Sequence, residues 1–350
     1  MPMTDRLKIL SVGGGWVVNN RHLPSITKNP DCRLIGVVSN QPARAESTAK
    51  KFRVANYHDK MDFQIGWQAE ADAVMIGTVP DTHYDLARMA LEAGKHVLVE
   101  KPMTLNTEQG RMLAELAKKN NRVLAVVHNF QFSRAAHAFR RAVAAGKIGR
   151  IRAVYGVQLC NHKRNIPAWC DELPLGLFFD ESPHFYYLFR WLTSGHCELL
   201  NASVWRSKTY KNTPRFVSAE YVSADNFPVY LHINFDSSLT EWHVLVVGDK
   251  GTMDIDVWRD IPIYLPNDGV HTAVDISRTS MLSIFQHGWG FVTGGLRYAA
   301  GRHLYGNPEV LDRFVRAIRG EDSLTGMNPD EGIAVVGMQR ELIEKAQYRD

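Results

Sequence analysis

The stretch KILSVGGGWVVNN, residues 8–20, sets an apolar run directly against three glycines. Residues 8–12 predict a short buried strand, and the glycines that follow predict a tight turn. Gly13 and Gly15 fit the first two glycines of the pattern Gly-x-Gly-x-x-Gly, with Trp16 and Val17 at the positions before the third. The third position is Val18. The pattern alone is also compatible with a glycine-rich turn that binds nothing.

The next hundred residues alternate between apolar runs and helical patterns. Strands are predicted at 33–38, 72–77, 96–99 and 122–127, and helices at 42–52, 81–93 and 107–120. This alternation predicts an α/β fold, a doubly wound parallel sheet covered on both faces. We therefore interpret residues 1–127 as a dinucleotide-binding Rossmann domain. In this interpretation Gly13, Gly15, Trp16 and Val17 lie beside the cofactor's pyrophosphate.

The end of the second predicted strand bears on the choice of cofactor. An acidic residue there would bind the ribose hydroxyls of NAD, but this chain has Ser39 and Asn40, with Arg44 five residues after Ser39. Hydroxyl, amide and guanidinium groups can hold a 2′-phosphate, which a carboxylate would repel. The sequence favours NADP over NAD, unless Arg44 is simply a solvated helix residue.

The pattern changes after Arg150, where most segments look extended. Strands are predicted at 151–159, 199–206, 218–223, 229–235, 241–247 and 251–256, several with alternating apolar and polar residues. We expect residues 128–350 to form an α+β substrate-binding and oligomerisation domain with a largely antiparallel open sheet. The last helix, predicted at 328–348, is expected to pack back on the first domain. Residues 257–304 leave three alternatives open, namely a lid, an oligomer contact or an irregular core cover.

Composition sets further limits on the class of protein. The chain has 350 residues, enough for two domains, with 45% hydrophobic and 22% charged residues. A net charge of +4 gives no reason to expect binding to nucleic acid, and no predicted segment is long and apolar enough to span a membrane. The chain shows no signal peptide, so we expect a cytoplasmic protein. The four cysteines, two of which flank His162, match no zinc pattern, so we expect reduced cysteines and no metal.

Three linked pieces of sequence resemble the Gfo/Idh/MocA oxidoreductases, the family of glucose–fructose oxidoreductase and inositol dehydrogenase. They are Thr78, Pro80 and His83 in one turn, the Ala-Gly-Lys-His step at 93–96, and Glu100-Lys101-Pro102. The resemblance implies that Thr78, Pro80, His83, Glu100 and Lys101 line the cofactor site. It also implies that Lys101 reaches both the nicotinamide and the substrate hydroxyl. Pro102 is expected to fix the turn, with a cis bond as one option.

The resemblance continues into the second domain. It implies a nicotinamide contact at Asn129, and Arg134 is a candidate substrate contact that could equally be a surface residue at a helix start. Ser182-Pro183 predicts a helix start with Ser182 as N-cap, which places His184 in the first turn, where the helix dipole favours a neutral imidazole. Asp180 and His184 reproduce the family's Asp-x-x-x-His spacing, so we expect His184 to act as general base, oriented by Asp180.

Together these observations predict an NAD(P)-dependent oxidoreductase acting on a secondary hydroxyl of a sugar, an inositol or a sugar derivative. Lys101, Asp180 and His184 are the expected catalytic residues. The resemblance further implies a homo-oligomer, a dimer or tetramer, formed through the second sheet. Two alternatives stay open: an eliminase or glycosidase that cycles a tightly bound cofactor, and a non-catalytic protein that keeps the fold.

Overall fold

The computed structural model describes residues 6–301 and 303–350. Within it the chain divides into two compact units, the first comprising residues up to Asn129 with Gly306–Gly337, the second Phe130–Tyr305 with Met338–Asp350. Among the described residues, no helix combines the length and the apolarity needed to cross a bilayer. The expectation that the chain has no signal peptide rests in part on residues 1–5, which lie outside the described part of the chain.

The first unit is built on a six-stranded parallel sheet with the strand order β3-β2-β1-β4-β5-β6. This order confirms the predicted doubly wound fold, and its direction reverses between β1 and β4, where such sheets bind ligands. Leu10, Val74 and Val97 in the central strands are completely buried. The strands are β1 (Leu7–Val12), β2 (Cys32–Val38), β3 (Tyr57–His58), β4 (Ala73–Ile76), β5 (His96–Val99) and β6 (Leu124–Val126).

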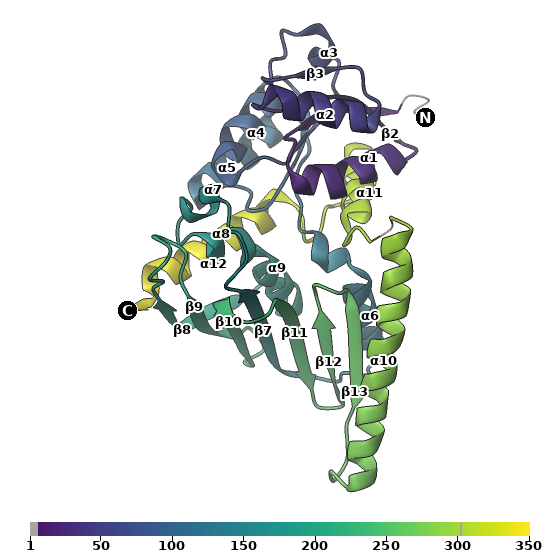
Figure 1. The fold of residues 1–350 in the computed structure, drawn as a ribbon, viewed down its shortest axis with the longest axis vertical. Helices are drawn as coiled ribbons and strands as arrows, with labels where there is room; N and C mark the ends of the chain where they lie inside the picture. The colour runs from purple at the N-terminus through teal and green to yellow at the C-terminus, as the bar shows by residue number, and fades with distance from the viewer. Residues whose placement is uncertain (1–5, 302) are drawn as a thin grey trace. The chain divides into compact units, whose positions relative to one another are not determined.

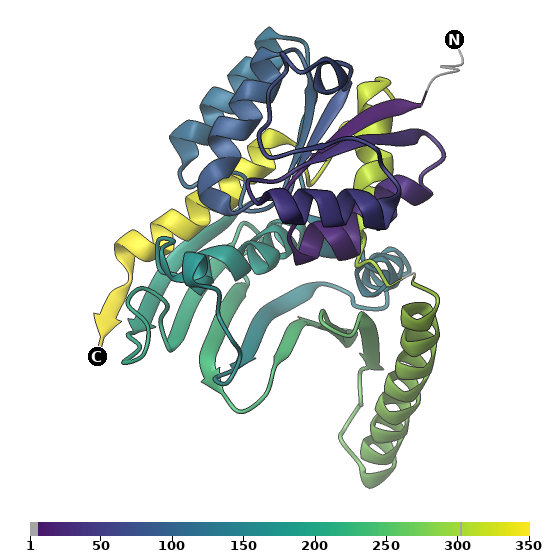
Figure 2. The ribbon, with the colours of Figure 1, turned by 45° about the horizontal axis from the view of Figure 1, so that its top comes forward.

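Helices cover both faces of this sheet. Figure 2 shows α4 and α5, in blue, on one face and α1 and α2, in purple, on the other. Gly94, with a φ of +72°, follows the end of α4, as its position in the sequence predicts. The helices of this unit are α1 (Leu23–Lys28), α2 (Pro42–Phe52), α3 (Gly66–Ala69), α4 (His83–Glu92), α5 (Thr107–Lys119) and α11 (Asn307–Ile318).

The second unit contains an eight-stranded sheet with the order β13-β12-β11-β7-β10-β9-β8-β14. All its strand pairs are antiparallel except β7 with β10 and β8 with β14, so the predicted largely antiparallel sheet is confirmed. Buried and partly exposed residues alternate along β9, β10 and β11. The strands are β7 (Ile151–Asn161), β8 (Cys197–Trp205), β9 (Phe216–Ser223), β10 (Pro228–Ser237), β11 (Glu241–Gly248), β12 (Gly251–Asp256), β13 (Ile261–Pro266) and β14 (Gln347–Arg349).

Helices pack on one face of this second sheet. Position 156 in β7 requires glycine, because a Cβ there would lie 2.6 Å from the ring of Phe189 in α9. The helices of this unit are α6 (Arg134–Ala144), α7 (Ala168–Asp171), α8 (Leu177–Glu181), α9 (Pro183–Leu192) and α10 (Ala273–Ala299). None of the four cysteines forms a disulfide, and three of them are buried.

Two segments differ from the sequence-based expectations. The span 257–304 is not an irregular cover, because it forms β13 and the 27-residue helix α10, which runs alongside β13 in Figure 1. The last helix, α12 (Pro329–Lys345), ends before 348, and residues 347–349 form β14 instead. Residues of α12 up to Gly337 belong to the first unit, where Ile333 packs against the sheet core, and later ones belong to the second.

Candidate active site

The glycine turn that follows β1 packs against Gly77, which follows β4, at the point where the strand order reverses. Gly13 has a φ of +114°, and a Cβ there would lie 2.4 Å from the carbonyl oxygen of Gly77. Val18, at the third motif position, is completely buried, and a side chain on Gly77 would overlap it. Valine therefore replaces the third glycine because Gly77 leaves room for it. A Cβ on Gly15 would meet no atom within 4 Å, which leaves the space that a pyrophosphate needs.

Side chains close around this turn. Asn19, which the motif did not single out, donates from Nδ2 to the carbonyl oxygens of Gly14 (2.9 Å) and Gly15 (3.2 Å). A Cβ on Gly14 would lie 2.7 Å from Cγ of Arg44 and 3.5 Å from Oγ of Ser39. Ser39 and Arg44 therefore both lie against the glycine turn.

Three other predicted cofactor residues lie on the surface of the same unit. Trp16 and Asn40 are exposed, and Val17 is 38% exposed. The guanidinium of Arg21 lies 5.4 Å from the Trp16 ring centre. This part of the turn is accessible from solvent.

His83 connects two of the motif pieces. It is completely buried, with Nδ1 2.8 Å from the carbonyl oxygen of Pro102 and Nε2 3.3 Å from that of Thr78. Burial lowers the pKa of His83, so the ring is neutral, with its proton on Nδ1 for the shorter bond. Thr78 Oγ1 lies 2.7 Å from Thr82 Oγ1, and Pro80 begins a turn of 3₁₀ helix. The Lys101–Pro102 peptide is cis, as the resemblance implied.

Glu100 is held by His22, a residue that the sequence did not single out. His22 Nε2 donates to the Glu100 carboxylate at 2.7 Å, and the Lys101 amide donates to the same carboxylate at 3.0 Å. Burial alone would raise the pKa of Glu100, but the His22 bond and the Lys101 charge outweigh it and hold this pKa below its ordinary value. Glu100 thus ties the end of β5 to the helical turn after the glycines.

The second unit contains Asp180 and His184, while Lys101 belongs to the first. The predicted helix start is confirmed, because α9 begins at Pro183 with Ser182 at the N-cap position. Ser182 makes no side-chain capping bond, however. It has helical dihedrals, its amide donates to Phe178 O at 2.9 Å, and α8 ends directly before it. His184 is therefore not at an open helix N-terminus, and the dipole argument for its neutral form loses its basis.

His184 is instead held by Tyr187. His184 Nδ1 lies 2.8 Å from the Tyr187 hydroxyl, which also accepts the Phe130 amide at 3.1 Å. A phenolic oxygen can accept two hydrogen bonds, so Tyr187 can hold the tautomer that carries its proton on Nδ1 and its lone pair on Nε2. This is the orienting role that the sequence assigned to Asp180, which lies in α8.

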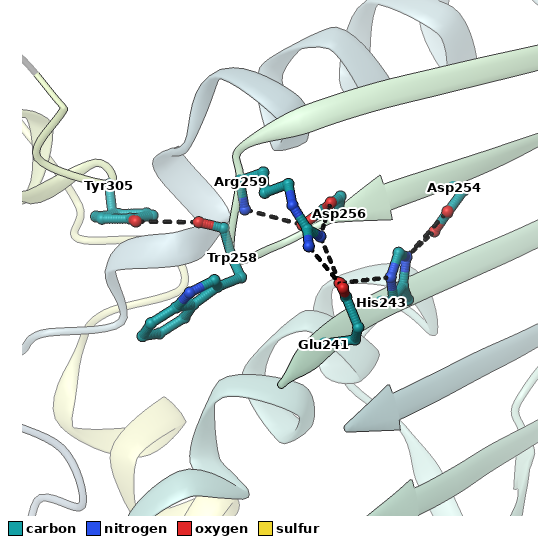
Figure 3. Close-up of polar contacts among 7 residues, drawn as sticks. All are labelled: Glu241, His243, Asp254, Asp256, Trp258, Arg259 and Tyr305. Carbon is teal, nitrogen blue, oxygen red and sulfur yellow. Dashed lines mark hydrogen bonds and ion pairs between the residues drawn. The ribbon is translucent and has the colours of Figure 1, made fainter. Parts of the chain in front are cut away.

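Aromatic side chains pack around the imidazole of His184. The ring of Phe130 lies 4.7 Å away and that of Trp242 5.6 Å away, centre to centre. Trp242 packs in turn on Trp258, which is 41% exposed. The carbonyl oxygen of Trp258 accepts a hydrogen bond from the Tyr305 hydroxyl at 3.0 Å (Figure 3). His184 thus lies in an apolar setting that extends to an exposed tryptophan.

A charged network lies next to Trp258, on the strands β11 and β12. Arg259 pairs with Glu241 and, at 2.8 Å, with Asp256, while His243 Nδ1 lies 3.0 Å from Asp254 (Figure 3). Within the described residues, Glu241, His243 and Asp256 are the one group whose ligand atoms could converge on a metal ion. Both carboxylates are already paired with Arg259, so we assign them no metal.

The two remaining predicted residues lie at the start of α6. Asn129 is buried and begins a short 3₁₀ turn. Arg134 is the first residue of α6, and its guanidinium donates to Thr293 Oγ1 of α10 at 2.8 Å. Its contact with substrate stays a prediction.

Comparisons with known proteins agree with this arrangement. A sequence profile described as "Oxidoreductase family, NAD-binding Rossmann fold" matches residues 7–128, and one described as "GFO/IDH/MocA C-terminal domain" matches residues 136–254. The chain is 29% identical to scyllo-inositol 2-dehydrogenase (NAD(+)) of Bacillus subtilis over 56% of this chain and 58% of that protein. Its matches span about half the length of the curated relatives.

Solved structures share the whole fold. GenD2 from gentamicin A biosynthesis, in complex with NAD, has a TM-score of 0.76 at 20% identity and covers 99% of this chain and 94% of its own. KijD10, a 3-ketoreductase from Actinomadura kijaniata in complex with TDP-benzene and NADP, also has a TM-score of 0.76, at 15% identity, with 99% and 100% covered. At these identities the likeness establishes the fold alone.

Proposed function

Because the chain belongs to the Gfo/Idh/MocA oxidoreductase family, we propose that it is an NAD(P)-dependent oxidoreductase acting on a sugar, an inositol or a sugar derivative. Oxidation converts a secondary hydroxyl of the substrate to a ketone, and reduction reverses this. The carbon gives up a hydride and the hydroxyl a proton. When bound, the nicotinamide supplies the hydride chemistry.

The observation that carries this proposal is the bond from His83 to the carbonyl oxygen of Pro102. It ties the turn after β4 to the Glu-Lys-Pro turn after β5, next to the glycine turn after β1. Ligands of doubly wound sheets bind at these carboxyl ends of the strands. These contacts support the proposal that Lys101 supplies the cation that a cofactor-dependent reaction needs there.

We assign the proton chemistry to three side chains. Lys101 donates a hydrogen bond to the reacting hydroxyl and stabilises the negative charge that develops on its oxygen. His184 takes the hydroxyl proton on Nε2, with Tyr187 holding Nδ1. Asp180 contacts the same substrate, as its spacing to His184 in the family pattern implies.

We also propose a preference for NADP over NAD. It is supported by the position of Arg44 and Ser39 against Gly14 and by the absence of an acidic residue at the end of β2. Fluorescence titrations of cofactor-free protein with NADPH and NADH test it. Arg44→Ala should weaken NADPH binding about tenfold or more and leave NADH nearly unchanged. Lys50→Ala, on the same helix, is the matched control and should change neither.

Turnover is tested with a panel of free sugars, nucleotide-linked sugars and inositols, followed by nicotinamide absorbance. Lys101→Ala and His184→Asn should each lower kcat at least about a hundredfold while NADPH still binds. A substrate consumed without net change in nicotinamide, by protein whose bound cofactor does not exchange, would indicate the closed redox cycle instead. Protein that binds neither nucleotide would contradict the proposal.

Oligomerisation through the second sheet remains our proposal as well. The partly exposed rings of Tyr155 and Tyr230 stack with their centres 5.1 Å apart, on neighbouring strands. Flat aromatic surface of this kind suits contact with a second sheet. Replacing both tyrosines by glutamate should lower the oligomer mass in light scattering.

A further inference from the structure

Helix α10 turns a polar side toward its own sheet. Its less exposed residues recur at helical spacing and are mostly small or polar. Gln286 accepts the amide of Tyr264 in β13 at 2.9 Å and donates to its carbonyl at 2.8 Å. Gly290 is the one buried residue of the helix, and a Cβ there would lie 2.6 Å from Ile261. Hydrogen bonds and a close backbone approach therefore attach α10 to β13.

The opposite side of α10 is apolar and exposed. Residues at spacings of three and four form a continuous stripe along the helix, flanked by two further large side chains. Surface helices normally turn the apolar side inward, so α10 has the reverse arrangement. The exposed fractions are Met281 65%, Ile284 66%, Phe285 69%, Trp289 63%, Phe291 70%, Val292 53% and Leu296 68%, and we call these seven residues the α10 face.

We propose that the α10 face is a dimerisation surface, and that its occupant is the same face of a second copy of this chain. With more than half of each of seven large side chains exposed, the face offers roughly 900 Å² of apolar surface. A stable protein–protein interface buries about 800 Å² on each partner. Monomeric proteins rarely expose an apolar patch of more than about 600 Å². The area therefore matches what a dimer needs.

Charge favours a second copy over other occupants. Residues 281–296 contain no Asp, Glu, Lys or Arg. In a two-fold dimer each face meets itself, so a face without charge escapes like-charge repulsion. A helix lying on a membrane surface needs a polar side rich in Lys and Arg facing water. Arg278 and Arg297 are the only such residues of α10, and its polar side is occupied by β13.

This dimer is independent of the proposed function and is separate from the sheet contact. Of the three alternatives for residues 257–304, it selects the oligomer contact. If both contacts form, the protein is a tetramer. If only the α10 face associates, the protein is a dimer, and in either case losing the face halves the mass.

The test is the molar mass of the full chain by size-exclusion chromatography with light scattering, over a range of concentrations. Phe285→Glu/Trp289→Glu should halve the mass and still bind NADPH, because the substituted side chains are exposed. Met112→Glu, which alters a half-exposed apolar residue of α5, is the control and should keep the full mass. Ile284→Lys/Phe291→Lys serves as a second variant of opposite charge and should also halve it.

A wild-type protein that is monomeric at all concentrations would overturn the proposal, and so would folded variants that keep the wild-type mass. A monomeric wild type is then tested for co-flotation with phosphatidylserine–phosphatidylcholine vesicles, and the decisive result is flotation that is lost in Phe285→Glu/Trp289→Glu. That result would assign the α10 face to a lipid surface.

Discussion

Replacing Gly13 by alanine should destabilise the first unit before any cofactor is considered. The residue has a φ of +114°, which costs an L-residue about 1–3 kcal/mol. The new Cβ would also lie 2.4 Å from Gly77 O and 2.8 Å from Gly77 C, both of them backbone atoms that cannot rotate away. Overpacking of this kind adds about 1–3 kcal/mol. A loss near 3 kcal/mol corresponds to a fall in Tm of roughly 6–12 °C for a unit of this size.

Gly15→Ala is the matched control, two residues along the same turn. Its Cβ would meet nothing within 4 Å, so Tm of the cofactor-free protein should stay within about 2 °C. The added methyl group enters the space assigned to the pyrophosphate, so NADPH affinity should fall roughly tenfold or more. Gly13 would thus be needed for the fold and Gly15 for the ligand.

The assay is thermal unfolding of cofactor-free protein, followed by circular dichroism, together with NADPH titration of each variant. A Gly13→Ala protein that melts within about 1 °C of wild type would refute the reasoning from close approach. A Gly15→Ala protein that binds NADPH as wild type does would refute the assignment of the turn to the pyrophosphate.

Two further predictions concern histidines. Burial lowers the pKa of His96 to about 4, and its Nδ1 accepts a hydrogen bond from the Val123 amide at 2.9 Å. Between pH 6.5, the ordinary pKa of histidine, and pH 4, the unfolded chain therefore binds a proton that the folded chain does not. The free energy of unfolding should therefore fall as pH drops from 6.5 toward 4, by about 2 kcal/mol after allowing for partial exposure of the ring. The fall should be smaller in His96→Asn. Equal slopes of Tm against pH in the wild type and in His96→Asn would contradict this. Tyr187→Phe removes the hydrogen bond to His184. It should lower kcat about ten- to a hundredfold with little change in KM. It should also move the acidic limb of the kcat–pH profile. A lower Tm with an unchanged profile would reduce Tyr187 to a structural role.

The local sequence determined much of the first unit. Apolar runs predicted β1, β2, β4 and β5 to within about one residue, because a strand buried on both faces must be apolar throughout. The alternation of β9 to β11 was equally readable. The Glu-Lys-Pro turn was predicted to belong to the site because it resembles the Gfo/Idh/MocA pattern together with the two other pieces of sequence that precede it.

Tertiary structure decided the contacts between segments that are distant in sequence. No periodicity reports that His22 meets Glu100, or that Gly77 makes room for Val18, since each pair depends on two strand ends meeting. Ser182 shows the same limit. The Ser-Pro pattern predicted where α9 starts, but it could not reveal that another helix ends directly before Ser182 and that the serine hydroxyl accepts a bond from Gln339 instead of capping α9.

The sequence did not predict helix α10, for a related reason. Its four glycines lower the helix signal, and its apolar residues lie on the side away from its own sheet. Periodicity reports which side of a helix is apolar, but not which side its neighbours cover. The sequence thus determined the elements, while packing between them decided which side chains are buried, which are paired and which remain exposed for a partner.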